Sequence, residues 1–333
     1  MPKTGFVVGK FYPPHRGHKY LIDTARAAVD HLTVMICGKP EYAIPTDIRA
    51  AWLREIHPDV DVIEVVDAID DDDSEGWANF VRETLGYVPD LVFTSEDYGD
   101  PFCRFLGSRH VLVDKARIAF PCSGTLVRED ALSMWDCLEP CVRAYFVRRV
   151  CVVGAESTGT TTTARALAER YGTIWVPEYG REYSEDKYQP GIDGQPPSVQ
   201  DWSTDEFVHI ARMQNELEDA ATRSANKVLF CDTGAFATNI WHRRYVGHLS
   251  PEVEALSTGR HYDLILLTDI DIPFVQDGLR DGEHIRQTMH NWFVELLTAQ
   301  STPWALLSGP LDERLTAASA LINQMMGRDT KTS

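Results

Sequence analysis

The 333-residue sequence lacks the features that mark several protein classes. Its seven cysteines are odd in number and form no C-x-x-C pair, so neither a disulfide framework nor a zinc site is predicted. No apolar run approaches the ~20 residues of a membrane helix, and no signal peptide precedes Gly5. We therefore expect a cytoplasmic protein without a membrane partner. Basic residues are also few: 32 Lys and Arg face 50 Asp and Glu, and a net charge of −18 argues against nucleic acid as a partner.

The remaining features are typical of a globular protein with two domains. The sequence is 44% hydrophobic and 25% charged, and its length suffices for two cores. Short apolar runs alternate with helical patterns, which predicts an α/β fold with parallel sheets that bind ligands at the carboxyl ends of their strands. We expect domains at 1–140 and 149–327, joined by a connector at 141–148. A flexible insertion is predicted at 189–198 and a disordered tail at 328–333.

A phosphate-binding loop is predicted near the middle of the chain. A β-branched run ends at Val153, Gly154-Ala-Glu-Ser-Thr-Gly159 follows, and a threonine run opens a helical pattern. The spacing of Gly154, Gly159 and Thr161 is that of a P-loop, whose backbone N–H groups converge on phosphate. Thr160 replaces the lysine of that motif. The alternative is a turn that binds nothing. The other residues expected to contact nucleotide here are Glu156, Ser157, Thr158, Thr160 and Thr162.

A second phosphate site is predicted near the N-terminus. An apolar strand at 5–9 runs into Lys10-Phe-Tyr-Pro-Pro-His15-Arg-Gly-His18, and helical spacing begins at Leu21. His15 and His18 can donate N–H groups to oxyanions beside the positive end of a helix dipole, and Gly17 leaves room for the backbone to approach. The acidic run at 70–73 is interpreted as a solvated loop.

The segment G-K-F-Y-P-P-H-R-G-H at 9–18 resembles the signature G-x-F-x-P-x-H-x-G-H of nucleotidyltransferases, in particular nicotinamide-mononucleotide adenylyltransferases. Ser123-Gly-Thr-Leu-Val-Arg128 resembles their second signature, S-x-T-x-x-R, and the stretch 94–99 resembles a segment near their adenylyl site. The resemblance implies that ATP phosphates, with bridging Mg²⁺, are held by His15, His18, Ser123, Thr125 and Arg128, beside Gly9, Lys10, Phe11 and Gly17.

A helical stretch at 46–56 resembles the nucleotide-binding segment of the same family. There Arg49 is expected to take the mononucleotide phosphate, and Trp52 to stack on the pyridinium ring. The alternative for Trp52 is a place in the core of an amphipathic helix.

The second half resembles the ribosylnicotinamide kinase domain of the NadR family, where that domain follows an adenylyltransferase. The motifs are P-E-Y-G-R-E at 177–182, F-C-D-T at 230–233 and D-I-P-F-V-Q-D-G-L-R at 271–280. The resemblance, which spans residues 4–326, implies that Glu178 or Asp232 orients or deprotonates the ribose hydroxyl and that Thr161 and Asp232 order Mg²⁺. Arg280 and Arg286 would act from a lid. Longer members carry an N-terminal helix-turn-helix; this chain starts at the nucleotidyltransferase strand, so no repressor function is expected.

The resemblance implies a two-step NAD salvage enzyme that uses ATP, ribosylnicotinamide and nicotinamide mononucleotide, with Mg²⁺. Three alternatives stay open: an adenylyltransferase whose P-loop domain is a nucleotide sensor, an adaptor without catalysis, and transfer to another acceptor such as pantetheine phosphate. Because Thr160 is neutral, an active kinase would need another cation, for which Arg280, Arg286 and Arg165 are candidates. The preference for amide or acid nucleotides and the oligomeric state, a homo-oligomer included, are left open.

Overall fold

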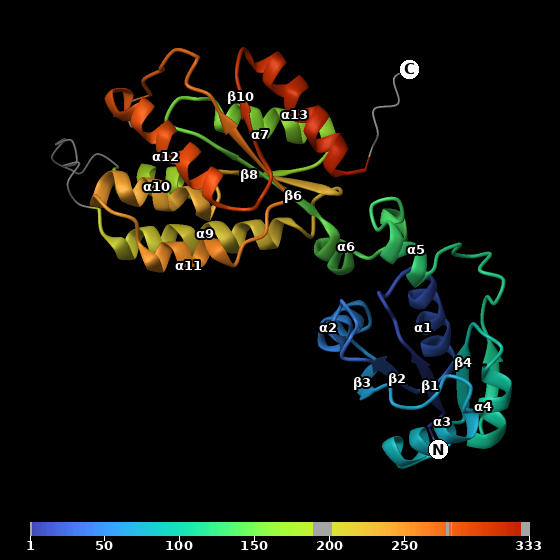
Figure 1. The fold of residues 1–333 in the computed structure, drawn as a ribbon. Coiled ribbons are helices and arrows are strands. Elements are labelled where there is room, and N and C mark those ends of the chain that lie inside the picture. The colour runs from blue at the N-terminus through green and yellow to red at the C-terminus, as the bar shows by residue number, and fades with distance from the viewer. Residues whose placement is uncertain (1, 189–201, 278–279, 281, 328–333) are drawn as a thin grey trace, which may run out of the picture. The chain divides into compact units, whose positions relative to one another are not determined.

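A computed structural model describes residues 2–188, 202–277, 280 and 282–327. The chain divides into two compact units, 1–146 and 147–333, and each is built on a five-stranded parallel sheet (Figure 1). The predicted α/β fold class with two parallel-sheet domains is confirmed. The insertion predicted at 189–198 and the tail predicted at 328–333 lie outside the described residues.

The stretch predicted as a connector, 141–148, is divided between the two units. Helix α6 (Pro140–Phe146) belongs to the first unit, and strand β6 (Arg148–Val153) begins the second. Cys141 and Val142 of α6 are buried against the first unit, in a cluster with Leu138 and Trp52. The boundary therefore falls between Phe146 and Val147, because apolar packing holds the whole of α6 in the first unit.

The sheet of the first unit has the strand order β3-β2-β1-β4-β5. Its strands are β1 (Thr4–Gly9), β2 (His31–Gly38), β3 (Asp61–Val66), β4 (Leu91–Thr94) and β5 (Arg109–Leu112). The helices besides α6 are α1 (Arg16–Ala28), α2 (Thr46–Ile56), α3 (Ser74–Leu85), α4 (Gly99–Leu106), α5 (Gly124–Glu129) and the short 3-10 helix η1 (Trp135–Cys137).

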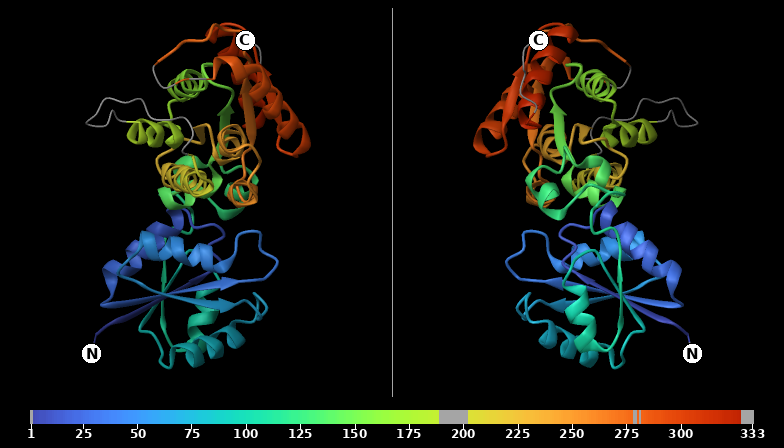
Figure 2. Two further views of the ribbon diagram at one scale, coloured as in Figure 1. Left: turned by 90° about the vertical axis from the view of Figure 1, so that its left-hand side faces the viewer. Right: turned by 90° about the vertical axis from the view of Figure 1, so that its right-hand side faces the viewer.

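Helices cover both faces of this sheet, which explains why its central strands are largely apolar (Figure 2). Successive side chains of a strand point to opposite faces. On β1, Val7 packs with residues of α1 and α2, whereas Phe6 packs with residues of α3 and α4. The same alternation places Ile36 with Val7 and Met35 with Phe6.

The sheet of the second unit has the order β10-β9-β6-β8-β7. Its strands besides β6 are β7 (Trp175–Val176), β8 (Val228–Asp232), β9 (Leu264–Thr268) and β10 (Trp304–Leu307). Its helices are α7 (Thr160–Tyr171), α8 (Tyr179–Lys187), α9 (Thr204–Ala221), α10 (Ala235–Val246), α11 (Pro251–Thr258), η2 (Glu283–Ile285), α12 (Arg286–Ala299) and α13 (Leu311–Met325). Helix α7 packs against α13, and α9 packs against α8, α10 and α11.

The strand order determines where each unit can bind a ligand. In the first sheet β1 lies between β2 and β4, and in the second β6 lies between β8 and β9. The chain leaves each of these central strands at its carboxyl end, where open parallel sheets form their binding crevice. The histidine signature follows β1 and the glycine-rich loop follows β6. Both predicted phosphate sites therefore lie at the expected edges of their sheets.

Candidate active sites

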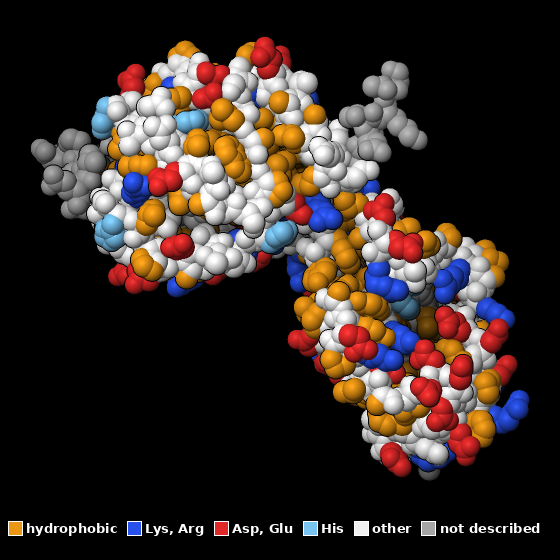
Figure 3. Space-filling view, in the orientation of Figure 1, with side chains coloured by type: hydrophobic (Ala, Val, Ile, Leu, Met, Phe, Trp, Pro, Cys, Tyr) orange, Lys and Arg blue, Asp and Glu red, His pale blue; other side chains and the backbone are white. Residues whose placement is uncertain are grey.

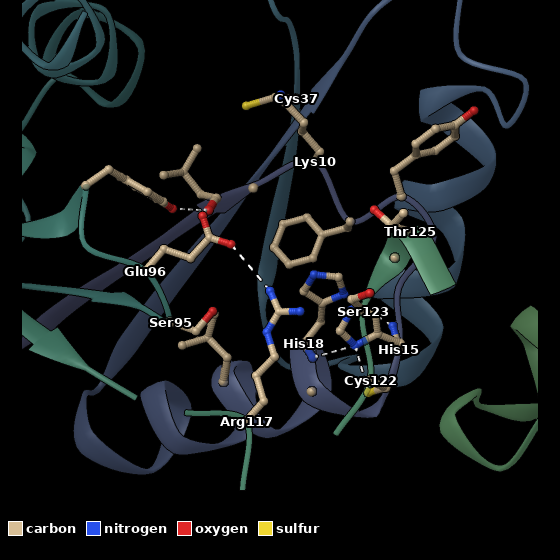
Figure 4. A pocket seen from close by; sticks show the side chains of 18 of the residues that line it. Lys10, His15, His18, Cys37, Ser95, Glu96, Arg117, Cys122, Ser123 and Thr125 are labelled. Atoms are coloured by element: carbon tan, nitrogen blue, oxygen red, sulfur yellow. Dashed lines mark hydrogen bonds and ion pairs between the residues drawn. The ribbon is translucent and has the colours of Figure 1, made fainter. Parts of the chain in front are cut away.

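A cavity of about 690 Å³ lies at the carboxyl end of β1 and brings the two predicted signatures together. The first signature contributes Gly9 to Tyr12, His15, Gly17 and His18, and the second contributes Ser123, Gly124, Thr125 and Arg128. Figure 3 shows a hollow in this unit with Lys and Arg side chains and a histidine around it, and Figure 4 shows the residues inside. The Ser95–Glu96 stretch after β4 also lines the cavity, as expected for the segment at 94–99.

His15 and His18 cap the first turn of α1 reciprocally. The His15 Nδ1 accepts from the His18 backbone N–H at 3.4 Å, and the His18 Nδ1 accepts from the His15 N–H at 3.3 Å. The two rings stack with centroids 3.7 Å apart. Because both Nδ1 atoms accept hydrogen bonds, each neutral ring carries its proton on Nε2 and can donate it to a ligand oxygen.

Both histidines of this pair are held in the neutral form. Burial, reinforced by the positive charge of Arg117, lowers the pKa of His15 to about 4. Burial also lowers the pKa of His18 well below its ordinary value, and the neighbouring charges of His15 and Arg117 act in the same direction. At neutral pH the pair therefore offers two uncharged N–H donors, and the positive charge of the cavity comes from other side chains.

Arg128 joins the two signatures directly. Its Nη1 donates to the carbonyl oxygen of Tyr12 at 2.5 Å, its Nη2 donates to Thr125 Oγ1 at 3.1 Å, and the guanidinium lies over the Tyr12 ring. Ser123 is the N-cap of α5 and accepts from the Leu126 N–H at 3.3 Å. A β-carbon on Gly124 would lie 2.5 Å from the Tyr12 carbonyl oxygen, so only glycine allows the two segments to approach this closely.

Arg49 and Trp52 are both buried in the structure. Arg49 is fully buried, and its guanidinium donates to the carbonyl oxygens of Ile44, Lys10 and Cys37. Those bonds hold the turn before α2 against the end of β1. Trp52 is 8% exposed and lies in an apolar cluster, which supports the core alternative over ring stacking.

Lys10 lines the cavity, and its ammonium group forms an ion pair with Asp71. Its Nζ lies 2.8 Å from Asp71 Oδ2, which raises the pKa of Lys10. Asp73 of the same acidic run is the N-cap of α3 and accepts from the Gly76 N–H. The run at 70–73 forms a loop as predicted, and Asp71 of this run lines the cavity.

Sequence reasoning missed Arg117, which also lines the cavity. Arg117 lies in the irregular segment between β5 and α5, with a positive φ of 51°, and its Nη2 is 3.6 Å from Glu96 Oε1. Figure 4 shows its guanidinium between Glu96 and the imidazole of His18. No motif points to this arginine, because the segment that carries it has no regular periodicity.

The predicted P-loop in the second unit forms a strand-loop-helix turn. Ser157 and Gly159 have positive φ values of 59° and 85°. A β-carbon on Gly154 would meet Thr268 Oγ1 at 2.2 Å and Thr158 Oγ1 at 2.5 Å. Thr158 itself is buried and its hydroxyl donates to the Ala155 carbonyl at 2.7 Å, so this side chain shapes the loop. Thr160 to Thr162 begin α7, as expected for the helix that receives phosphate at its N-terminus.

Two carboxylates lie beside this loop. Thr161 Oγ1 donates to Asp232 Oδ2 at 2.5 Å, which joins the start of α7 to the end of β8. Burial raises the pKa of Asp232, although hydrogen bonds from Thr161, Thr160 and Thr233 oppose the shift. Burial and the nearby charge of Asp232 raise the pKa of Glu178, just before α8, to about 8. A carboxyl group with that pKa can accept a proton close to neutral pH.

Arginines brace the loop from outside. Arg286 donates to the carbonyl oxygens of Glu156 at 3.1 Å and Ser157 at 2.9 Å, and Arg314 donates to that of Thr158 at 2.5 Å. Arg244 and the Glu156 side chain form a buried ion pair at 2.6 Å. Arg286 also donates to the carbonyl oxygen of Ile272, so its Nε, Nη1 and Nη2 all donate to backbone oxygens and hold the loop in place.

Arg280 differs from these bracing arginines. Its Nη1 donates to the Val275 carbonyl at 2.8 Å and reaches Ser157 Oγ at 3.5 Å, and its Nε pairs with Asp277 at 3.2 Å. Its side chain is about one third exposed. Arg280 therefore lies at the surface of the loop, whereas Arg314, which sequence reasoning missed, is buried behind it.

The hydroxyl of Thr161 and the carboxylate of Asp232 are hard oxygen donors, which suit Mg²⁺ completed by water and substrate phosphate. Among the described residues, no three His, Cys, Asp or Glu side chains gather as a metal cluster. None of the described helices is long and apolar enough to cross a membrane.

The fold and the two sites define a class of protein in which a nucleotidyltransferase-like unit is joined to a P-loop unit. A family profile described as "AAA domain" matches residues 149–314. "Trifunctional NAD biosynthesis/regulator protein NadR" of Escherichia coli K12 is 30% identical over 97% of this chain and 83% of its own length. The protein of the same name from Salmonella typhimurium LT2 is also 30% identical, over 97% of this chain and 83% of its own length. The chain belongs to the NadR family.

Two solved structures have the same fold. A crystal structure of NadR protein in complex with NR aligns with a TM-score of 0.81 at 20% identity, over 98% of this chain and 97% of the other. One of NadR protein in complex with NAD and AMP-PNP aligns with a TM-score of 0.76 at 19% identity, over 100% and 98%.

Proposed function

We propose that the chain is an NAD-salvage enzyme whose first unit transfers the adenylyl group of ATP to nicotinamide mononucleotide. The observation that carries this proposal is the cavity in which His15 and His18 face Ser123, Thr125 and Arg128. The names of the curated relatives, which are NAD biosynthesis proteins, support it.

In the proposed reaction a phosphate oxygen of the mononucleotide attacks the α-phosphorus of ATP. The new oxygen–phosphorus bond forms as the bond to the β-phosphate bridging oxygen breaks, and pyrophosphate leaves. No protein nucleophile is needed, because the attacking oxygen is already ionised. The chain's task is to position the reactants and stabilise charge. The Nε2–H groups of His15 and His18 donate to phosphate oxygens without carrying charge, and bound Mg²⁺ would screen the phosphates.

We further propose that the second unit phosphorylates ribosylnicotinamide. A ribose hydroxyl oxygen attacks the γ-phosphorus of ATP, its proton passes to a carboxylate, and ADP leaves. Glu178 is the better base, since its pKa of about 8 lies near neutral pH and Asp232 is bonded to Thr161. Thr161 and Asp232 would hold Mg²⁺, which polarises the phosphates when bound. The crystal structure of NadR in complex with NR fits this proposal.

A second candidate for this unit is a nucleotide sensor without kinase activity, and Thr160 at the lysine position is the observation that favours it. The test is to incubate the protein with Mg²⁺, ATP and either nicotinamide mononucleotide or ribosylnicotinamide, and to separate products by chromatography. NAD from the mononucleotide supports the first proposal, and its absence refutes it. Mononucleotide or NAD from ribosylnicotinamide supports the kinase. If NAD formed from the mononucleotide and no product formed from ribosylnicotinamide, the second unit would be a nucleotide sensor without kinase activity. Replacing the mononucleotide by its acid form measures the preference between amide and acid.

A further inference from the structure

The cavity of the first unit has little free positive charge for a ligand as anionic as ATP. Of the described residues that line it, three are cationic at neutral pH and four are carboxylates, since both histidines are neutral. The cations are Lys10, Arg117 and Arg128, and the carboxylates are Asp67, Asp71, Glu96 and Asp114. The binding of a triphosphate therefore depends on which cation can turn away from its present partner.

Arg128 is held by two hydrogen bonds, and Lys10 has a closer ion-pair partner than Arg117 has. Lys10 forms a 2.8 Å ion pair with Asp71, and Arg128 donates to the Tyr12 carbonyl and to Thr125. Moving Arg128 would break the contact that joins the two signatures, because its Nη1 is bonded to the backbone of one and its Nη2 to the side chain of the other.

The third cation, Arg117, is held only loosely at its side chain. Its ion pair with Glu96 spans 3.6 Å between partners whose side chains are 48% and 60% exposed. Exposed pairs of this kind contribute little net stability, because water solvates both charges when they part. Its backbone, by contrast, is fixed: the Arg117 N–H donates to the Asp114 carbonyl at 2.8 Å, and Asp114 Oδ1 accepts from the Ile118 N–H at 2.9 Å.

The position of Arg117 suits a phosphate that also touches the histidine pair. Figure 4 shows its guanidinium beside His18, with Glu96 on the other side. Its charge acts on both imidazoles, lowering the pKa of His15 and of His18. A guanidinium can bind a phosphate through two parallel N–H donors.

We propose that Arg117 binds the terminal phosphates of ATP in this cavity and that these phosphates displace Glu96 as its partner. Glu96 then acts as a competitor that occupies the arginine until ATP or pyrophosphate arrives. The inference rests on the proposed adenylyl transfer. It adds a phosphate-binding residue outside both signatures and a role for the segment at 94–99.

The test measures KM and kcat for adenylyl transfer to the mononucleotide and for the reverse reaction of NAD with pyrophosphate. A charge-assisted hydrogen bond is involved, so Arg117→Met should raise KM for ATP and for pyrophosphate about 10- to 100-fold. KM for the mononucleotide should change little, and Arg117→Lys should restore part of the loss. Glu96→Gln should act in the opposite direction and lower KM for ATP about two- to fivefold, because the competing charge is gone.

Arg54→Met is the matched control. Arg54 lies on α2 outside the cavity lining, its side chain is also 48% exposed, and it pairs with Glu64 of β3 at 3.0 Å. Its KM values should equal those of the parent. If the ion pair were purely structural, Arg117→Met and Glu96→Gln would change KM for ATP in the same direction, and both would also change the thermal midpoint of unfolding. That outcome, or an unchanged KM for ATP in Arg117→Met, would overturn the proposal. If the parent itself made no NAD, the proposed function would fail first.

Discussion

Arg280 is predicted to supply the charge that the P-loop lacks at Thr160. Thr160 is the first residue of α7, and Arg280 Nη1 reaches Ser157 Oγ of the same loop at 3.5 Å. Two unit charges ~4 Å apart interact by about 4 kcal/mol at an effective dielectric constant near 20. Because Arg280 is about one third exposed, water reduces this value. We expect Arg280→Ala to cost about 2–3 kcal/mol of transition-state stabilisation, or roughly 30- to 150-fold in rate.

The assay is transfer of labelled γ-phosphate from ATP to ribosylnicotinamide, measured in four proteins: the parent, Arg280→Ala, Thr160→Lys and the double variant. If the two positions supply the same charge, Thr160→Lys should change the parent rate little and should restore most of the activity lost in Arg280→Ala. The double-mutant cycle then gives a coupling energy close to the cost of Arg280→Ala. Arg212→Ala, an exposed arginine on α9, is the control and should match the parent.

Two results would refute this reasoning. Parent-like transfer in Arg280→Ala would show that another group neutralises the phosphates. No transfer in the parent, with activity appearing only in Thr160→Lys, would show that the unit is a lapsed kinase that still has the P-loop fold. In that case adenylyl transfer would be the only enzyme activity proposed for the chain.

Three further predictions follow from the two sites. His18→Ala should slow NAD formation about 10²–10³-fold, and NAD formation at the parent rate would contradict the proposed site. The same variant should lower the unfolding free energy of its unit by only about 1 kcal/mol, because the capping pair is lost, and thermal unfolding would measure this change. Gly124→Ala should cost about 1–3 kcal/mol and most adenylyl transfer, since its β-carbon would lie 2.5 Å from the Tyr12 carbonyl oxygen, whereas Gly259→Ala, with nothing within 4 Å, should behave as the parent in urea unfolding. The kinase rate should rise with pH through about 8 as Glu178 loses its proton, and Glu178→Gln should abolish the rate at every pH. Because the pKa of Glu178 is raised in the folded state, its contribution to the free energy of unfolding is complete at pH values below its unfolded pKa near 4.5 and is lost as the pH rises toward 8. Glu178→Gln should remove this pH dependence of the unfolding free energy, as urea titrations at several pH values would show.

Glycine spacing and short-range patterns made much of the fold predictable from sequence. The alternating strands and helices, the histidine turn after β1 and the P-loop after β6 depend on residues that are neighbours in the chain, so their geometry is largely local. His15 and His18, three residues apart, meet at one helix start for that reason. Helices α10 and α11 were not predicted. Half of α10 is buried, including Thr238, Asn239 and His242, and this blurs the apolar stripe that marks a surface helix.

The roles of individual arginines were decided only by the tertiary structure. Arg49 and Arg286 stand in motifs that suggest phosphate binding, yet both donate to backbone carbonyl oxygens. Arg117, which no motif marks, lies in the cavity beside Glu96, 21 residues earlier in the chain. An arginine side chain is long and can satisfy its donors with a ligand or with the protein. Whether it bonds a ligand or the protein depends on which backbone oxygens distant segments bring within its reach. The spacing of residues along the sequence does not show which distant segments come together.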